Sequence, residues 1–351
     1  MPSARTIFLC ASVFLASAFI SISVRRHASP LALSHTLLSQ HSPASSYAYA
    51  TFLSADTTAH AIEDPPPDDP EEHDGYYLAT RVLAYQLLHQ PNTRSNTSIP
   101  FLVLAAPGVE AAKLARLTAD GATVIADVPP IAAEWIHPRE PRWRDVLIKL
   151  RVAQQLSYAK VCYIDADMLL VASLDGVFED PAATRAKTGS SLEALHDHES
   201  PLPKSYVFAG VPDAWGYDHA FPPPETSEQG LSFFNTGFFV LAPSTEIFAY
   251  YAGLVSDVAN KDKLGGAEFP DQDALNYAHR RDGNMPWRRL GAQWQANWPT
   301  KRDWEAGVKS FHAKYWDGDP SHDVVLREEW ERVRDEMRVF YRGWDERGGG
   351  R

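Results

Sequence analysis

The sequence predicts an α/β protein built on one large sheet, and two observations carry that prediction. Strand-like and helix-like segments alternate from residue 47 to about residue 180, a pattern that implies a largely parallel sheet with helices on both faces. The chain has 351 residues, of which 44% are hydrophobic, enough to form one large α/β core or two small ones. A formal net charge of −12 argues against a nucleic-acid partner.

The predicted elements follow from residue patterning along the chain. Apolar and β-favouring runs predict strands at 47–54, 99–108, 122–130, 162–175 and 231–244, the last a strand pair or one strand bent at Thr236-Gly237. Apolar residues at helical spacing predict helices at 76–89, 109–121, 143–160, 243–260, 271–280 and 322–342. The apolar face of the helix at 143–160 comprises Val146, Leu150, Ala153 and Leu156. The stripe of the last helix, Leu326, Trp330, Val333, Met337 and Phe340, predicts a core-packing face.

The N-terminus carries an uncharged apolar run at residues 7–24, flanked by arginines. Its length is close to the minimum for a membrane-spanning helix. We expect a signal-anchor over 1–26 and a stem over 27–45; a cleaved signal peptide, processed at the Ala-Ser-Ala of 16–18, is the alternative. The anchor is favoured because the apolar run continues past that site. Either interpretation sends the chain into the secretory pathway.

Two carboxylates, Asp165 and Asp167, interrupt the apolar stretch CYIDADMLLVASLD. If one strand continues through them, they point to the same face, and their repulsion in a low-dielectric site favours a bound divalent cation. Oxygen ligands suit Mg²⁺ or Mn²⁺, and an added imidazole favours Mn²⁺. A solvated turn is the structural alternative. Haloacid-dehalogenase-like phosphatases also begin from Asp-x-Asp, but Leu169 occupies the place of their small hydroxylated or β-branched residue.

Five segments, in consistent order from about Tyr47 to Trp316, resemble the family 8 glycosyltransferases, especially the glycogenin-like branch. They are YAYATFLS, FLVLAAPGV with ATVIADV, VLIKLRVAQQLSYAKVCYIDADMLLVASLDGVFE, FFNTGFFVLAPS and PDQDALN. The resemblance implies a glycosyltransferase A-type fold, with a single Rossmann-like mixed sheet flanked by helices and an acceptor-side subregion. It also implies a UDP-sugar donor, Mn²⁺ with Mg²⁺ as the alternative, and transfer with retention of configuration.

The resemblance also assigns roles to individual residues. It implies a metal site of Asp165, Asp167 and His312, and catalytic positions at Asp271, Gln272, Lys149 and Asn235. It implies that the residues that contact the donor are Thr51, Phe52, Leu53, Tyr77, Lys149, Asp165, Ala166, Asp167, Asp213 and Lys314. Among these, Tyr77 would stack on the uracil and Lys314 would contact a phosphate. Asp213 would lie on the sugar or acceptor side.

The chain departs from glycogenin in ways that bear on its function. An acidic, proline-rich loop at 63–74 separates the first strand from Tyr77, and QWQANWPTKRDW occupies the neighbourhood of the tyrosine that glycogenin glucosylates on itself. With the apolar N-terminus, these features favour a membrane-anchored transferase in the Golgi or ER lumen, or a secreted one, acting on a glycan or glycoprotein. We expect its catalytic domain at 46–345 and a flexible tail at 346–351. A non-catalytic UDP-sugar-binding relative is the alternative.

Overall fold

The computed structural model describes residues 46–55, 74–140, 143, 145–191, 201–224 and 232–348, all of which belong to one compact unit, Pro43–Arg351. The predicted anchor and stem, nearly all of the acidic loop and the last three residues of the tail lie outside the described residues. Within the described ranges, none of the helices combines the length and the apolar character needed to span a membrane.

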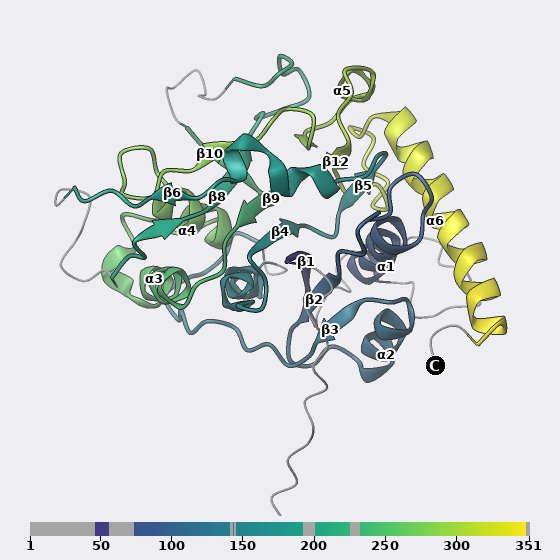
Figure 1. Cartoon of the computed structure of the whole chain (residues 1–351), viewed down its shortest axis with the longest axis horizontal. Coiled ribbons are helices and arrows are strands. Elements are labelled where there is room, and N and C mark those ends of the chain that lie inside the picture. Colours follow the sequence, from purple (N-terminus) through teal and green to yellow (C-terminus); the bar gives the residue numbers. More distant parts are fainter. Residues whose placement is uncertain are drawn as a thin grey trace, which may run out of the picture. The chain divides into compact units, whose positions relative to one another are not determined.

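A seven-stranded sheet forms the centre of the fold (Figure 1). Its spatial order is β10-β8-β9-β4-β1-β2-β3. The strands are β1 (Tyr47–Leu53), β2 (Phe101–Ala105), β3 (Thr123–Ile125), β4 (Lys160–Ile164), β8 (Phe208–Pro212), β9 (Phe234–Leu241) and β10 (Arg288–Arg289). The first four are parallel to one another, whereas β9 runs antiparallel to both β4 and β8. The α/β class is therefore confirmed, with a mixed sheet.

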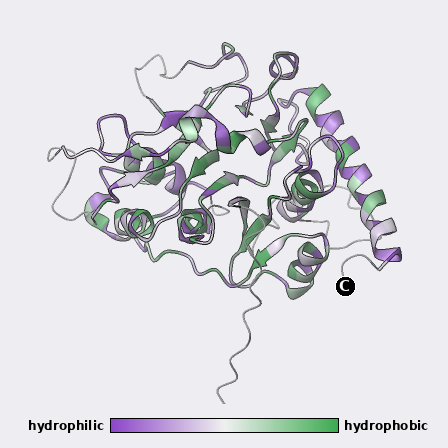
Figure 2. Ribbon diagram, in the orientation of Figure 1, coloured by the Kyte–Doolittle hydropathy of each residue, from purple (hydrophilic) through white to green (hydrophobic). Residues whose placement is uncertain are grey.

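Helices flank this sheet, as the alternating pattern predicts. They are α1 (Gly75–Leu88), α2 (Ala111–Ala119), α3 (Thr245–Ser256), α4 (Pro270–Ala278), α5 (Lys301–Glu305) and α6 (Val324–Glu346), with 3₁₀ helices η4 (Val146–Gln154), η5 (Asp175–Glu179), η6 (Pro181–Ala183) and η7 (Val258–Asn260). Hydrophobic residues concentrate in the central strands, while α6 alternates between hydrophobic and hydrophilic positions (Figure 2). The side of α6 that carries Leu326, Trp330, Val333 and Met337 is buried and shares a hydrophobic cluster with α1, which confirms the core-packing stripe; Tyr341, not Phe340, completes it.

The helix expected at 143–160 is the main difference between expected and observed helices. It is a 3₁₀ helix that ends at Gln154, and Leu156 lies beyond it with 56% of its surface exposed. Seven of the nine residues of η4 are buried, because it is enclosed by the sheet and by α3 and α4. A helix that is buried nearly all round has no solvent face to define an amphipathic stripe, so the sequence pattern misplaced its end.

A second, three-stranded sheet carries the end of the Asp-x-Asp stretch. It has the order β11-β12-β5, formed by Ala296–Asn297, Ser310–His312 and Met168–Leu170; a third sheet pairs β6 (Ala186–Lys187) with β7 (Ser205–Tyr206). The expectation of one continuous strand through both aspartates is wrong. Strand β4 ends at Ile164, the chain bends over Asp165–Asp167, and β5 then enters the other sheet.

Candidate active site

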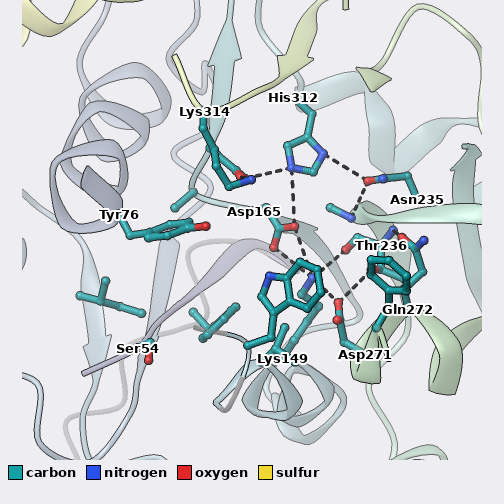
Figure 3. Close-up of a pocket in the computed structure, with 18 residues that line it drawn as sticks. Ser54, Tyr76, Lys149, Asp165, Asn235, Thr236, Asp271, Gln272, His312 and Lys314 are labelled. Carbon is teal, nitrogen blue, oxygen red and sulfur yellow. Dashed lines mark hydrogen bonds and ion pairs between the residues drawn. The ribbon is translucent and has the colours of Figure 1, made fainter. Parts of the chain in front are cut away.

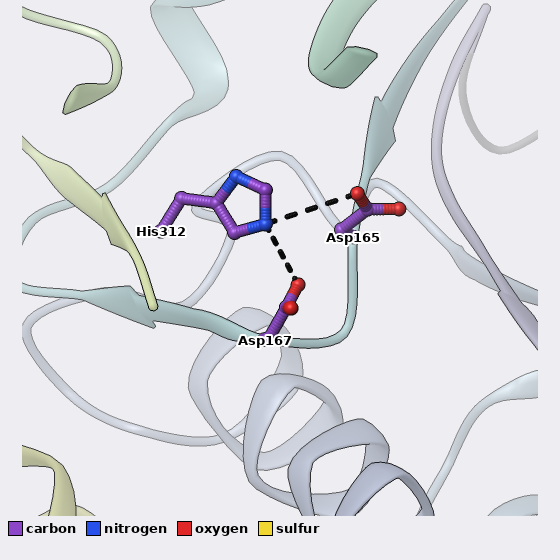
Figure 4. A group of neighbouring side chains, drawn as sticks. All are labelled: Asp165, Asp167 and His312. Atoms are coloured by element: carbon purple, nitrogen blue, oxygen red, sulfur yellow. Dashed lines mark ion pairs between the residues drawn. The ribbon is translucent and has the colours of Figure 1, made fainter. Parts of the chain in front are cut away.

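The bend between β4 and β5 brings the two aspartates together with a histidine from far along the chain. In the antiparallel pair of β12 with β5, His312 lies opposite Met168, and the Ala313 amide donates to the Asp167 carbonyl oxygen at 3.0 Å. One ligand atom from each of Asp165, Asp167 and His312 lies within 4.8 Å of the others (Figure 4). The aspartates converge because of the bend and the strand register, rather than through a shared strand face.

Electrostatics within this group suit a cation. The His312 Nε2 atom lies 2.9 Å from Asp167 Oδ1 and 3.8 Å from Asp165 Oδ2, while Lys314 Nζ lies 3.0 Å from Asp167 Oδ2. Burial opposes ionisation of Asp167, but the positive charges of Lys314 and His312 outweigh it and hold its pKa well below the usual range. Burial also opposes protonation of His312, yet Asp167 raises its pKa above the usual value. The Lys314 ammonium supplies positive charge to these two converging carboxylates, and the raised pKa of His312 favours a second positive charge beside them.

The histidine is oriented by an asparagine on β9. Asn235 Oδ1 lies 3.2 Å from His312 Nδ1 and also accepts a hydrogen bond from the Gly237 amide at 2.9 Å. Because Nδ1–H donates to this amide oxygen, Nε2 is the ring nitrogen that faces the carboxylates, where a neutral imidazole would offer its lone pair to a metal. Two carboxylates and one imidazole form a donor set that fits Mn²⁺, and Mg²⁺ less well.

A glycine makes the close approach of His312 to β9 sterically allowed. A Cβ atom at Gly237 would lie 2.4 Å from His312 Cε1 and 2.7 Å from His312 Nδ1. Strand β9 also shifts its register against β8 here, because Gly210 pairs with Phe239 but Val211 pairs with Asn235. The sequence predicted a strand pair or a bend at Thr236-Gly237; β9 is one strand, Phe234–Leu241, with a register shift at this place. The Gly237 carbonyl accepts from the Asp165 amide at 2.8 Å, so the shifted segment also fixes the start of the bend.

Lys149 links the group of Asp165, Asp167 and His312 to α4. It is 2% exposed, and its Nζ lies 2.5 Å from Asp271 Oδ2, 3.1 Å from Asp165 Oδ1 and 3.3 Å from the Thr236 carbonyl oxygen. Burial alone would lower the pKa of this lysine, but the charges of Asp165 and Asp271 raise it above its usual value. The ammonium is therefore a permanent positive charge beside the aspartates. The alternative of an ordinary solvated helix lysine is excluded by this burial.

Side chains in the first and second turns of α4 attach to the shifted part of β9. Asp271 Oδ2 accepts from Thr236 Oγ1 at 2.8 Å, and Gln272 Oε1 accepts from the Thr236 amide at 3.4 Å. Asn276 exchanges two hydrogen bonds with the backbone of Phe234, each 3.0 Å long. The sequence PDQDALN thus supplies three side chains to the strand that positions His312, and one of them, Asp271, also binds Lys149.

These groups surround a pocket beyond the carboxyl ends of β1 and β4 (Figure 3), where ligands bind in α/β sheets. The residues that line it are Phe52, Leu53, Ser54, Tyr76, Trp143, Val146, Lys149, Asp165, Ala166, Asp167, Asn235, Thr236, Gly237, Phe269, Asp271, Gln272, His312 and Lys314. Every expected catalytic and metal-binding position therefore lies on one cavity, together with Phe52, Leu53, Ala166 and Lys314 from the expected donor contacts.

Three expected donor contacts lie elsewhere. Thr51 and Tyr77 are fully buried in the core, and Asp213 lies outside the pocket, where its carboxylate accepts from the Trp215 amide at 3.1 Å. On a helix, consecutive residues point in directions about 100° apart, so Tyr76 lines the pocket while Tyr77 faces inward. Tyr76 packs edge-on against Trp316, with ring centroids 5.2 Å apart.

Sequence reasoning missed seven of the lining residues: Ser54, Tyr76, Trp143, Val146, Thr236, Gly237 and Phe269. Most of these lie within the motif segments or directly beside them. Thr236 and Gly237 follow Asn235, Phe269 lies two residues before Asp271, and Val146 lies one 3₁₀ turn before Lys149. Adjacency to a motif was therefore a usable signal, but it does not distinguish lining residues from buried ones.

Comparisons with known proteins give relatives without an assigned activity and solved structures of limited similarity. No protein-family model matches the chain. Two Schizosaccharomyces pombe proteins described as uncharacterized, C4C3.09 and C5H10.12c, are 29% identical over 297 residues and 26% identical over 299 residues. The alignments cover 77% of this chain in both cases, and 76% and 77% of the respective yeast proteins.

The solved structures that the chain resembles include three glycosyltransferases. The galactosyltransferase LgtC, in complex with donor and acceptor sugar analogues, gives a TM-score of 0.48 at 14% identity, covering 82% of this chain and 95% of LgtC. Streptococcus pneumoniae GlyE gives 0.45 at 14%, covering 87% and 65%. Mouse xyloside xylosyltransferase 1 gives 0.43 at 12%, covering 76% and 97%. With every TM-score below 0.5, the chemistry of the pocket itself has to carry the assignment of function.

Proposed function

We propose that the protein is a glycosyltransferase with an A-type fold, which uses a divalent metal and moves a hexose or N-acetylhexosamine from a UDP-sugar to a glycan or glycoprotein, with retention of configuration. One observation carries the proposal. Asp165, Asp167 and His312, from distant parts of the chain, converge on a pocket that also holds Lys149 and Asp271. A cation site, a fixed ammonium and a carboxylate together suit sugar transfer from a nucleoside-diphosphate sugar, because they stabilise the leaving diphosphate and the charge at the anomeric carbon.

The metal-binding group accounts for the departure of UDP. Asp165, Asp167 and His312 would hold Mn²⁺, which would neutralise diphosphate charge and act as a Lewis acid for the leaving group. His312 offers Nε2 because Asn235 engages its Nδ1. Lys314, 3.0 Å from Asp167, would turn its charge toward a phosphate once a cation neutralises that carboxylate. Lys314 therefore serves as the proposed phosphate contact.

Lys149 and Asp271 act on the sugar side of the pocket. The Lys149 ammonium is held by two carboxylates and by the Thr236 carbonyl, so it is already oriented when the donor binds. Fixed charges of this kind stabilise developing charge without reorganisation during the reaction. Asp271, held by Lys149 and by the Thr236 hydroxyl, would stabilise positive charge that develops at the anomeric carbon. Gln272 lies beside it on the pocket wall.

The proposal also includes the family, the cellular location and the residues that contact the nucleoside. The motif order favours family 8 and its glycogenin-like branch, and the apolar N-terminus favours a lumenal enzyme of the Golgi or ER with a signal-anchor at 1–26. For the uracil we propose Tyr76, which lines the pocket, in place of the buried Tyr77. Phe52 and Leu53, at the end of β1, would complete the nucleoside side.

Donor hydrolysis tests the proposal directly. The full-length protein would be incubated with UDP-glucose, UDP-galactose or UDP-N-acetylglucosamine, with Mn²⁺ or with EDTA, and UDP release would be followed. We expect Mn²⁺-dependent release from one donor and at least a 100-fold loss in Asp167→Asn, because one of the three proposed ligands is weakened. The matched control is Asp282→Asn, which changes an exposed carboxylate outside the pocket.

Two outcomes would contradict the proposal. A folded protein that binds UDP but hydrolyses no donor would point to a non-catalytic UDP-sugar-binding relative. Release of phosphate from a generic phosphate ester, lost in Asp167→Asn, would point to a phosphatase instead.

A further inference from the structure

Two tryptophans outside the pocket are exposed on unfavourable backbone. Trp215 is 58% exposed and has φ of 60°, and Trp298 is 44% exposed and has φ of 53°. The left-handed region is disfavoured for bulky L-residues, and large aromatic side chains are normally well buried. Both positions therefore combine a strained backbone with a loss of burial. Strain of this kind often marks a functional site.

Hydrogen bonds of Asn297 join the two chain segments that carry the tryptophans. The Ala214 amide donates to Asn297 Oδ1 at 2.7 Å, and Asn297 Nδ2 donates to the Pro212 carbonyl oxygen at 2.9 Å. Trp215 directly follows Ala214 in the sequence, and Trp298 directly follows Asn297. Tyr217 packs edge-on against Trp298, with ring centroids 5.2 Å apart. We call Trp215, Tyr217 and Trp298 the aromatic platform.

The platform is continuous with the pocket through two strands. Asn297, directly before Trp298, pairs in register with His312. Phe233, whose ring lies edge-on to Trp215 at 5.9 Å, is two residues before the pocket residue Asn235. Lys314, which also lines the pocket, lies close enough to Tyr217 to lower its pKa, although burial raises that pKa overall. A ligand on the platform would therefore reach toward the metal-binding group.

Contacts with α5 and with the Trp298 segment fix the 217–219 loop of the platform. His219, whose side chain is 3% exposed, has Nε2 3.5 Å from Asp303 Oδ2 and 3.2 Å from the Trp298 carbonyl oxygen. Arg302 Nη2 donates to the Tyr217 carbonyl oxygen at 3.0 Å. These contacts join α5, the Trp298 segment and the 217–219 loop, so the exposed rings are displayed by a braced loop.

We propose that the aromatic platform binds a sugar ring of an uncharged glycan acceptor and presents its hydroxyl to the pocket. The proposal rests on the proposed function. The C–H face of a pyranose is apolar and can pack on an indole, whereas its hydroxyls need hydrogen-bond acceptors at the rim. Asp213 and Asp218 flank Trp215 and Tyr217 in sequence and supply such carboxylates.

The charge of the residues around the aromatic platform favours a neutral glycan over an anionic ligand. Tyr217 Oη lies 3.4 Å from Ser321 Oγ, the Ser321 amide donates to Asp319 Oδ1 at 2.8 Å, and the Asp319 amide donates to Asp317 Oδ1 at 2.9 Å. These two carboxylates and that of Asp218 are exposed and outnumber Arg302, whose Nη2 lies 4.0 Å from Asp218 Oδ1, so they place negative charge around the rings. An anionic glycan or an anionic membrane surface would be repelled, whereas a neutral oligosaccharide would not.

Asparagine substitutions separate a binding role from a structural one, because asparagine tolerates the left-handed region better than tryptophan. Trp215→Asn and Trp298→Asn would be compared with Leu156→Asn, a control at another exposed apolar residue. The probes are maltotetraose, lactose and chitotetraose. Their binding to the full-length protein would be measured by saturation-transfer NMR, and acceptor and donor KM would be measured with the donor that the wild type uses.

We expect one probe to bind, and each tryptophan variant to weaken it at least tenfold with a melting temperature equal to or above that of the wild type. The rise in acceptor KM should exceed any change in donor KM by tenfold. Binding that is unchanged in both variants, loss that occurs only with a lowered melting temperature, or no binding of any probe would overturn the inference. Binding to neutral vesicles that is lost in the variants would also overturn it, in favour of a membrane contact.

Different measurements test the proposed function and the proposed role of the platform. Wild-type donor hydrolysis, measured without an acceptor, tests the proposed function, whereas oligosaccharide binding by NMR needs no turnover. A protein that hydrolyses a donor but binds every probe equally well with and without the tryptophans would keep the function and lose the platform.

Discussion

The pocket buries charged side chains, whereas the aromatic platform exposes apolar ones. In the pocket, charged side chains are buried, so each carboxylate is paired with a cation or a hydrogen-bond donor, as with Lys149 between Asp165 and Asp271. On the platform, apolar rings are exposed, and the cost falls on the backbone of Trp215 and Trp298. The pocket rests mainly on strand ends and helices, whereas the platform rests on loops.

This difference indicates where substitutions should affect folding and where they should affect only ligand recognition. A buried charge network is interdependent, since removing one member leaves a partner unpaired in a low-dielectric site. An exposed ring on a loop that other contacts hold in place has few packing partners. Its loss should therefore alter ligand recognition rather than folding. We therefore expect substitutions in the pocket to affect stability and chemistry together, and substitutions around the platform to separate them.

The largest effect should come from Lys149→Met. This variant tests whether the charged groups of the pocket depend on one another for stability. The variant leaves Asp165 and Asp271 without their shared cation, and breaking a buried pair typically costs about 3–5 kcal/mol. We expect a loss of this size in the free energy of unfolding, measured by urea denaturation, together with loss of donor hydrolysis. Lys309→Met, at a residue outside the pocket, is the control. A fully stable Lys149→Met protein would show that the network is not coupled to folding.

Gly237→Ala sharpens the account of how His312 is positioned. The added methyl group would meet His312 at 2.4 Å and Asn235 Oδ1 at 2.9 Å, so the imidazole must move away from the aspartates. Disturbing a residue that orients a metal ligand typically costs about 10–100-fold in affinity, and we expect a loss in that range for Mn²⁺ by calorimetry.

Gly210→Ala, where the methyl group would meet the Phe234 ring at 3.1 Å on the neighbouring strand, controls for crowding of the sheet. It should lower stability but leave Mn²⁺ affinity within about twofold of the wild type, because it does not touch the imidazole. Equal Mn²⁺ affinity in the wild type and in Gly237→Ala would disprove the positioning role of the glycine.

The smallest effect concerns the brace of the platform. The hydrogen bond with Asp303 raises the pKa of His219 above its usual 6.5. The stabilisation from protonated His219 is therefore complete below about pH 6.5 and is lost as the pH rises through the higher folded-state value. We expect His219→Gln to lower stability by about 1 kcal/mol or less at pH 6, with the difference shrinking above pH 8. Thermal unfolding at several pH values measures this, and a deficit that grows with pH would contradict it.

Much of the fold and most of the site could be predicted because their signals are local. The alternation of apolar runs and helical spacing located most strands and helices. The segments around Asp165, Asn235 and Asp271, together with His312, carried the expected catalytic and metal-binding positions now found on one cavity. The structure differs from the sequence expectations in the strand through Asp165 and Asp167, in the helix at 143–160, and in placing Thr51, Tyr77 and Asp213 outside the pocket. The burial of Tyr77 and the end of that helix depend on which side of an element faces the core. A spacing rule cannot supply that for an element buried nearly all round.

The sequence by itself determined the α/β class and the residue types of the pocket, because periodicity and residue chemistry are properties of neighbouring positions. Only the tertiary structure decided that β4 and β5 enter different sheets, that the register of β12 places His312 against Asp167, and that Gly237 makes room for its ring. It also decided that Asn297 joins the chain segments that carry Trp215 and Trp298. These facts depend on contacts between distant segments, which are fixed by the packing of the whole core and leave no periodic trace in either segment.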